Sequence, residues 1–244
     1  REVRDVRFAT KVMASRDVRD PFWVPVPFEG PILPGPIKVA VTKESYGYPI
    51  HPEIISGVDR AADYLRNAGY QVEEVETPSI KPAVDAWLDA VTLELKETID
   101  PLARQHGSKT IQDIFDAYYQ FGKMVDYKGY MQAVANRSAM VRNWSVFLEE
   151  WPLVLSPFFM RPMYDYDHDE TFDGAKDLFD AMMYSYSINY LGLPAGNIPI
   201  GLVEGRPCGV QIIGQRFRED MILDAMQVVE DQVGVLAHQL WAQM

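Results

Sequence analysis

Residues with catalytic potential are present, but none stands in a recognised catalytic spacing. The chain has no Gly-x-Ser-x-Gly nucleophile elbow, no Ser-x-x-Lys pair and no glycine-rich loop of the kind that holds a phosphate. The four histidines lie near expected helix ends, in loops or in the C-terminal tail: His51, His106, His168 and His238. Nothing around them suggests the nucleophile–base pair of a catalytic triad. We therefore predict that this chain contributes no catalytic residue.

The densest group of potential metal ligands is the segment 164–170, which reads YDYDHDE. Its carboxylates and His168 are ligand types that a hard divalent cation accepts. The segment lacks the glycine that marks a calcium-binding loop, and acidic surface loops are common. We interpret it as a solvated loop, and we predict no bound metal and no cofactor.

Cys208 is the single cysteine, which rules out an internal disulfide and a cysteine-rich metal site. It lies in or beside an apolar strand, so we interpret it as a packing residue and not as a nucleophile. A chain without disulfides suits a reducing compartment, and we expect a cytoplasmic protein.

The best candidate for binding a small molecule is the apolar loop after the expected strand at 153–157. Open α/β sheets bind their ligands beyond the carboxyl ends of their strands. We predict that four side chains of this loop contact a substrate: Phe158, Phe159, Met160 and Met163. The alternative interpretation is that the loop is simply buried.

Three regions supply the elements that would position this loop. A strand at 37–42, a helix that ends near 67 and a strand at 71–76 form a βαβ unit, so the two strands should be parallel. Apolar runs at 197–203 and 209–214 predict a β-hairpin inside a larger sheet, with Pro199 making its strand irregular. Helical spacing covers 82–103, 111–121, 127–150, 172–190 and 221–233. The sequence predicts an α/β fold with a mixed, largely parallel sheet flanked by helices.

The overall charge limits the partners. The formal net charge is −12, and the sequence pI is about 4.8. Nucleic acids and anionic membrane surfaces require basic patches, so we expect neither as a partner. No apolar run approaches the roughly 20 residues of a membrane span.

The stretch 189–220 resembles the C-terminal signature of the amidase signature family, which comprises serine hydrolases of carboxamides. In that family a helix ends in an Asn-x-x-Gly-x-Pro loop, and a strand, a Gly-x-Gln strand and a further helix follow. The matches keep their order and spacing: Asn189, Gly192, Pro194, Pro199, Gly209, Gln211, Ile213, Gly214, Phe217 and Asp220. Weaker matches extend the resemblance to Ser156-Pro157, Arg137 and the segment that begins at Arg1.

The resemblance implies a division of labour. The family's nucleophilic serine, its relay serine and its basic lysine lie in a Gly-Gly-Ser-Ser-Gly-Gly region that this chain lacks. Residues 1–244 would then be the C-terminal portion of an amidase-signature domain, with a helical insertion around 82–150. We expect a carboxamide hydrolase whose substrate cleft this chain shapes. Its expected partners are a small amide and either a missing N-terminal catalytic half or a second copy, as in a homodimer.

A non-catalytic binding or scaffolding module, or a subunit on the same fold, is the alternative. The family's amidotransferase subunits act with a partner on charged tRNA. This chain lacks the Glu-Ala-Ser-Ser-Asn segment that we expect of them, with Glu94-Leu-Lys-Glu97 near that place. The resemblance therefore favours the hydrolase.

Overall fold

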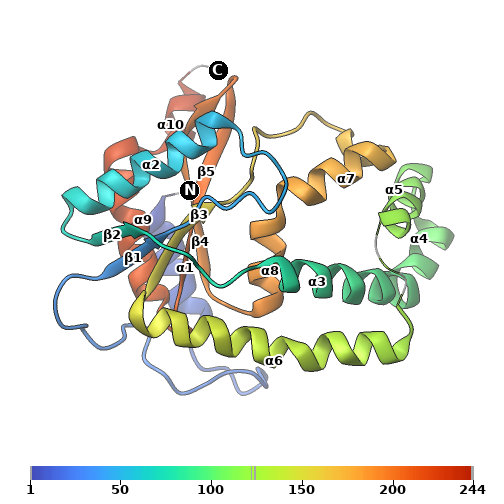
Figure 1. The fold of residues 1–244 in the computed structure, drawn as a ribbon, viewed down its shortest axis with the longest axis horizontal. Helices are drawn as coiled ribbons and strands as arrows, with labels where there is room; N and C mark the ends of the chain where they lie inside the picture. The colour runs from blue at the N-terminus through green and yellow to red at the C-terminus, as the bar shows by residue number, and fades with distance from the viewer. Residues whose placement is uncertain (1, 122, 124, 243–244) are drawn as a thin grey trace.

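One mixed sheet of five strands forms the centre of the protein (Figure 1). The computed structural model describes all residues except 1, 122, 124 and 243–244. The strand order across the sheet is β2-β1-β3-β5-β4. The strands are β1 (Lys38–Val41), β2 (Gln71–Glu74), β3 (Leu153–Pro157), β4 (Ala195–Val203) and β5 (Arg206–Gly214).

The expected βαβ unit is confirmed. Helix α2 (Pro52–Asn67) connects β1 to β2, and the two strands pair in parallel. Strand β3 is also parallel to β1, whereas β5 runs antiparallel to both β3 and β4. Two of the four pairings are therefore parallel. Because β1 has its sequence neighbour on one side and β3 on the other, the carboxyl ends of β1 and β3 flank a topological switch point.

Each face of the sheet is covered by helices, as buried parallel strands require. Helices α2 and α9 (Glu219–Val233) pack on one face against Val41, Leu155 and Ile212. Helices α3 (Lys81–Glu94), α6 (Tyr127–Glu150) and α8 (Met183–Leu191) cover the other. Alternate residues of β1, β3 and β5 thus enter two separate cores.

The predicted insertion is a helical arm that projects from the sheet (Figure 1). Helix α3 continues through a π-helical turn (Leu95–Ile99) into α4 (Asp100–His106), and α5 (Lys109–Phe121) precedes α6. Gly122, which we expected to separate the last two helices, lies outside the described residues. The Trp87 ring of α3 stacks on Tyr186 of α8 at a centroid distance of 4.4 Å, which ties the arm to the body.

The single helix expected over 172–190 is wrong in one respect, since the chain forms two helices there. Helix α7 (Phe172–Ala181) ends before α8, and Met182 between them has φ −105° and ψ 19°. The backbone N–H of Met160 donates to the Ala181 carbonyl oxygen at 2.9 Å. This bond from the loop after β3 satisfies a carbonyl at the end of α7, where the helix stops.

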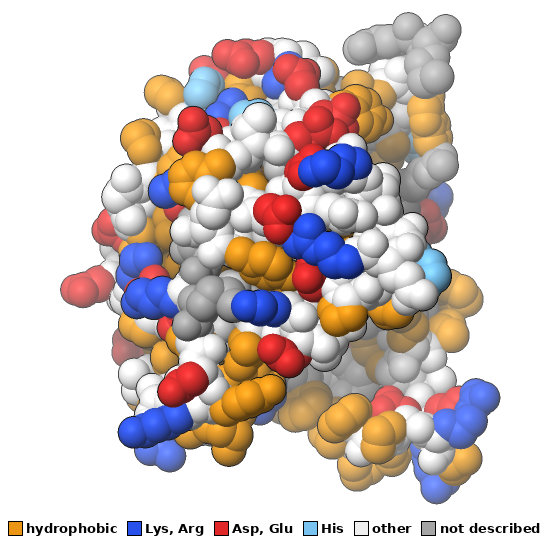
Figure 2. Space-filling model, turned by 90° about the vertical axis from the view of Figure 1, so that its right-hand side faces the viewer, with side chains coloured by type: hydrophobic (Ala, Val, Ile, Leu, Met, Phe, Trp, Pro, Cys, Tyr) orange, Lys and Arg blue, Asp and Glu red, His pale blue; other side chains and the backbone are white. Residues whose placement is uncertain are grey.

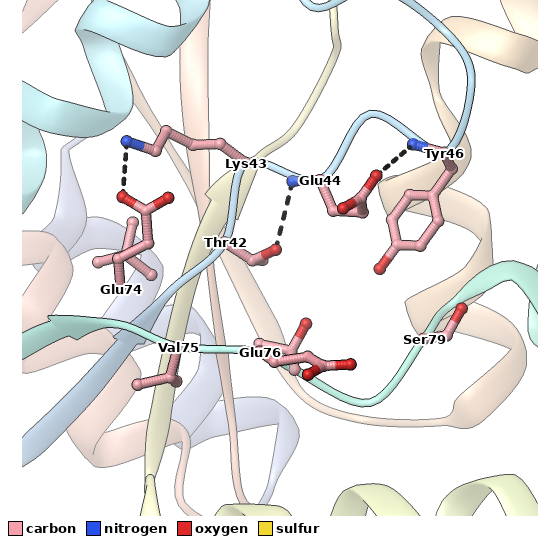
Figure 3. Close-up of a pocket in the computed structure, with 10 residues that line it drawn as sticks. Thr42, Lys43, Glu44, Tyr46, Glu74, Val75, Glu76 and Ser79 are labelled. Atoms are coloured by element: carbon pink, nitrogen blue, oxygen red, sulfur yellow. Dashed lines mark hydrogen bonds and ion pairs between the residues drawn. The ribbon is translucent and has the colours of Figure 1, made fainter.

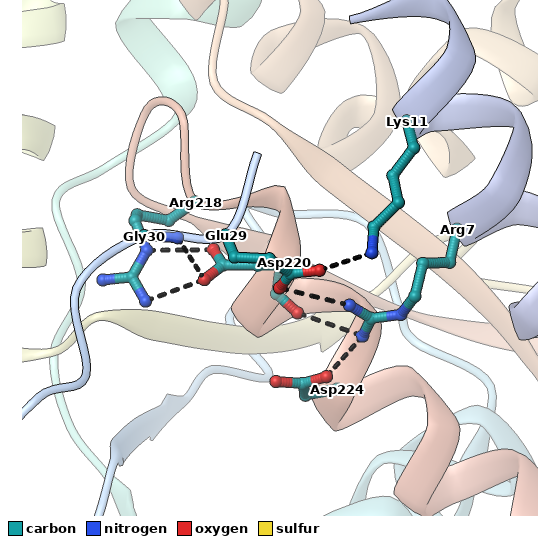
Figure 4. A network of polar contacts seen from close by, with 7 residues as sticks. All are labelled: Arg7, Lys11, Glu29, Gly30, Arg218, Asp220 and Asp224. Atoms are coloured by element: carbon teal, nitrogen blue, oxygen red, sulfur yellow. Dashed lines mark hydrogen bonds and ion pairs between the residues drawn. The ribbon is translucent and has the colours of Figure 1, made fainter. Parts of the chain in front are cut away.

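A buried ion pair fixes the N-terminal region to the body (Figure 4). Arg218 donates to Asp220 at 2.9 and 3.0 Å, and the backbone N–H of Gly30 donates to the same carboxylate at 2.9 Å. Helix α1 (Val3–Met13) joins through Arg7, whose guanidinium contacts Asp224. The proline-rich connection and α1 are therefore both held at the start of α9.

The hairpin turn carries backbone strain that a substitution should relieve. Strands β4 and β5 are joined by Glu204 and Gly205, which have φ +52° and +77°. Positive φ at both positions is typical of a type I′ turn, which favours Asn-Gly. We expect Glu204→Asn to stabilise the protein by up to about 1 kcal/mol, and Gly205→Ala to destabilise it by about 1 kcal/mol. Urea unfolding of both variants measures the difference, and equal signs would contradict the turn assignment.

The surface carries both charge signs. Figure 2 shows acidic and basic side chains interspersed on the face that bears α4, α5 and α7. No helix among the described residues is long and apolar enough to cross a membrane. A last short helix, α10 (Leu236–Trp241), follows α9 within the expected C-terminal segment.

Candidate functional site

An apolar pocket of about 240 Å³ lies beyond the carboxyl end of β3, between the following loop and the β4–β5 hairpin. Its position agrees with the rule that α/β sheets bind ligands at strand carboxyl ends. The lining side chains are mostly apolar and come from three segments: Ile54, Phe158, Phe159, Arg161, Met163, Asn197, Ile198, Pro199, Pro207, Cys208 and Gly209.

Three of the four predicted substrate-binding residues line this pocket. They are Phe158, Phe159 and Met163. Met160 points elsewhere: it is fully buried in the core beneath α8 and does not line the pocket. Its backbone binds both sides, because its carbonyl also accepts from the His51 N–H at 2.8 Å. Substrate contact by all four residues stays a prediction, and for Met160 the position favours packing.

The aromatic wall is pre-arranged. The rings of Phe158 and Phe159 meet edge to face at 5.1 Å, and Phe159 meets Tyr164 in the same way at 6.5 Å. Such pairs add about 0.5–1.5 kcal/mol beyond the burial of their area. The wall therefore offers an apolar surface suited to an aromatic or aliphatic group.

An irregularity in β4 makes room for the pocket. The pairing register shifts between Pro199 and Gly201, which confirms the irregular strand expected at Pro199. Across the hairpin, a Cβ added at Gly209 would come within 2.9 Å of the Ile198 carbonyl oxygen. Pro199 and Gly209 pair with each other, so a strand break and a missing side chain coincide at the pocket wall.

Two arginines hold the loop after β3 from opposite sides. Arg206 of β5 donates to the Met163 carbonyl and to the Asp165 carboxylate, both at 2.7 Å. On the other side Arg161 forms an ion pair with Asp177 of α7. The loop is thus fixed between the hairpin and α7.

Asp177 collects further polar groups. The Tyr48 hydroxyl donates to it at 2.8 Å, and His168 Nε2 lies 3.2 Å from its second oxygen. Burial would raise the pKa of Asp177, but the Tyr48 hydrogen bond and the Arg161 charge outweigh it and lower that pKa. Asp165 and His168 from the acidic segment are therefore engaged in loop contacts. Among the described residues no group of three or more potential ligands could hold a metal ion.

Cys208 lines the pocket but is poorly suited to act as a nucleophile. It is buried, and its thiol lies 3.5 Å from the Gly201 carbonyl oxygen. Burial raises the pKa of the thiol above its ordinary value, so it stays protonated at neutral pH. This supports the interpretation of Cys208 as a packing residue.

A second, more polar pocket of about 530 Å³ lies at the carboxyl ends of β1 and β2 (Figure 3). Lys43 is its basic residue, and its ammonium lies 2.9 Å from both Glu74 and Asp59. Hydrogen bonds from these two carboxylates raise the pKa of Lys43, so it stays charged. A permanently charged lysine cannot accept a proton, and this pocket shows no base for hydrolysis.

Sequence reasoning located the loop but missed part of the pocket. Arg161, Asn197 and Pro207 also line it. The position of Asn197 opposite Gln211 follows from the hairpin register, which could have signalled its place. Asp177 carried no local signal, because it lies within an ordinary helical pattern.

Sequence comparison gives a consistent result. The model of the Amidase family matches residues 1–223. Indoleacetamide hydrolase of Bradyrhizobium diazoefficiens is 38% identical over 247 residues, covering 100% of this chain and 47% of the relative. The GatA-type component of the glutamyl-tRNA(Gln) amidotransferase of Clostridium botulinum is 25% identical, over 92% of this chain and 52% of its own length. The chain thus spans about half the length of these relatives.

Solved structures share the fold. A 6-aminohexanoate cyclic dimer hydrolase superposes with a TM-score of 0.75 at 19% identity, covering 97% of this chain and 54% of that one. A bacterial aryl acylamidase of the amidase signature enzymes superposes with a TM-score of 0.72 at 22% identity, covering 95% and 51%. The expected α/β architecture, matching about half of such enzymes, is confirmed.

Proposed function

Because the chain belongs to the amidase signature family, we propose that it forms the substrate-cleft half of a hydrolase of small carboxamides that carry an aromatic or apolar group. The family hydrolyses amide C–N bonds, and the chain's relatives are amidases or amidotransferases. In this proposal the reactive serines and lysine come from a catalytic half that lies outside residues 1–244.

The apolar pocket beyond β3 is the observation that carries the proposal. Its aromatic wall and its irregular hairpin leave a cavity of about 240 Å³, which suits one ring or a short alkyl chain. The 38% identical relative is named for indoleacetamide, an amide with an aromatic group. Both observations favour an arylacetamide as substrate.

The residues of this chain would act by binding and exclusion of water. Phe158, Phe159 and Met163 would bury the apolar group of the substrate and so aim its carboxamide toward the catalytic half. An apolar wall also lowers the local dielectric, which strengthens any hydrogen bond to the developing oxyanion. The chain alone is then expected to be inactive.

The alternative, a binding module or a subunit of a larger assembly, receives less support. The amidotransferase relatives are only 23–26% identical, whereas the indoleacetamide hydrolases reach 38%. The net charge of −12 also disfavours tRNA, because phosphate contacts require basic residues. We retain the hydrolase as the proposed function.

A domain exchange tests the proposal. Residues 1–244 would replace the corresponding half of the Bradyrhizobium diazoefficiens relative, and ammonia release from indoleacetamide would be measured. We expect turnover by this two-part enzyme and none by residues 1–244 or by the remaining half alone. A folded, monodisperse chimera without turnover on aryl and alkyl carboxamides would refute the proposal.

The partner belongs to the same proposal. Strand β4 is at one edge of the sheet, with Ala195, Asn197 and Pro199 exposed. An unpaired edge is a template for association with another chain. We propose that a catalytic half covers it, or a second copy when that half is absent, in the cytoplasm. Sedimentation of residues 1–244 with and without the other half distinguishes a mixed complex from a homodimer.

A further inference from the structure

The apolar pocket contains one charged side chain. Arg161 is the sole ionised group among the described residues that line it, and its side chain is 36% exposed. An unpaired guanidinium in such a pocket would bind a carboxylate in preference to a neutral group. The charge state of this corner therefore decides which substrates fit.

Asp177 lies behind Arg161 and forms an ion pair with it. Both carboxylate oxygens are in use, because Tyr48 donates to Oδ1 and His168 contacts Oδ2 together with Arg161. The guanidinium also lies over the Tyr164 ring, 4.5 Å from its centroid. Arg161 is thus held in place as well as neutralised.

The other charges nearby are balanced or lie outside the apolar pocket. Glu204 and Arg206 line an adjoining polar pocket of about 410 Å³, which shares Arg161 with the apolar one. Arg206 pairs with Asp165. No further carboxylate among the described lining residues faces Arg161 from the apolar pocket.

We propose that Asp177 masks the charge of Arg161, so that this pair restricts the pocket to uncharged aromatic or apolar amides. The inference rests on the proposed function and deepens it, because it names the charge class of the substrate. Asp177 acts through Arg161, and Arg161 is the specificity-determining residue.

The physical basis is a competition between carboxylates. With Asp177 present, a carboxylate on the substrate would meet an arginine that is already paired and would be repelled by Asp177. Without that charge, the guanidinium could make a charge-assisted hydrogen bond to the substrate in a poorly solvated site. The two cases differ in sign, which makes the inference testable.

Asp177→Asn in the two-part enzyme is the first test, since it removes the charge and keeps the shape. Two ligands are compared: phenylacetamide and para-carboxyphenylacetamide. We expect the ratio of kcat/KM to move toward the carboxylated amide by about tenfold, the low end for a charge-assisted hydrogen bond. Asp180→Asn on the same helix is the matched control, because it breaks only an exposed pair with Lys176 and should leave the ratio unchanged.

Arg161→Gln supplies the reciprocal test and remains available if Asp177→Asn does not fold. It leaves Asp177 unmasked, so preference should move toward an amide that bears a para-aminomethyl group. Calorimetric binding of the three ligands needs no turnover, so it decides the inference even if the chimera proves inactive. Opposite shifts in the two variants support charge masking. Ratios that do not change, equal losses for all ligands, or no binding of any ligand overturn it.

Discussion

Replacing Asp220 by Ala should lower the free energy of unfolding by about 3–5 kcal/mol, the range for breaking one side of a buried ion pair. The Asp220 carboxylate is 8% exposed, and its partner Arg218 is 12% exposed. The substitution would leave a buried guanidinium and the Gly30 N–H without their acceptor (Figure 4). Chemical denaturation of the variant and the parent measures the loss.

Asp224→Ala is the matched control on the same helix. Its carboxylate is 60% exposed and pairs with Arg7 at the surface, so its removal should cost no more than about 1 kcal/mol. Equal losses for the two variants would show that Asp220 does not anchor the N-terminal region.

The same carboxylate predicts a pH dependence. Burial would raise the pKa of Asp220, but the Arg218 and Gly30 hydrogen bonds outweigh it, and the folded-state pKa is lowered. The pair's contribution is therefore complete above the ordinary pKa of about 3.9 and is lost as the pH falls through the lowered value. Asp220→Asn should flatten this acid limb below about pH 4, and parallel limbs would contradict the assignment.

Replacing Met160 by Ala should cost about 2–5 kcal/mol of stability, because the side chain is fully buried in the core beneath α8. Met163 is 43% exposed and lines the apolar pocket, so Met163→Ala should change stability by about 0.5 kcal/mol or less. In the two-part enzyme Met163→Ala should raise KM for an arylacetamide instead. Unfolding curves and steady-state kinetics of both variants provide the comparison.

The opposite outcome would restore the initial prediction for Met160. If Met160→Ala left stability intact and raised KM, its side chain would contact substrate and the core placement would be misleading. If neither variant altered KM, the pocket beyond β3 would not be the substrate site.

The fold was largely predictable because its signals are local. The βαβ unit follows from apolar strands on either side of a helix that begins after His51 and ends before Gly69. The irregular strand follows from Pro199 alone, since proline cannot donate a ladder hydrogen bond. Helix 172–190 was predicted as continuous because its break depends on a distant group, the Met160 N–H, which periodicity cannot reveal.

The site was predictable only in part for the same reason. Adjacent apolar residues identified the loop, and three of its four selected side chains line the pocket. Met160 sits among them in sequence yet turns into the core, since neighbouring loop residues need not share a direction. Asp177 matters only through contacts with Tyr48, Arg161 and His168, which come from separate segments.

The most direct measurement of the central claim is the selectivity of the two-part enzyme when the aromatic wall is removed. Phe158→Ala with Phe159→Ala should lower kcat/KM for indoleacetamide by about tenfold or more, because each lost ring withdraws about 1.5–3 kcal/mol of apolar burial. Hydrolysis of acetamide, which is too small to reach the wall, should change little. An equal fall for both amides, or no fall for either, would show that this half of the enzyme does not shape the substrate cleft.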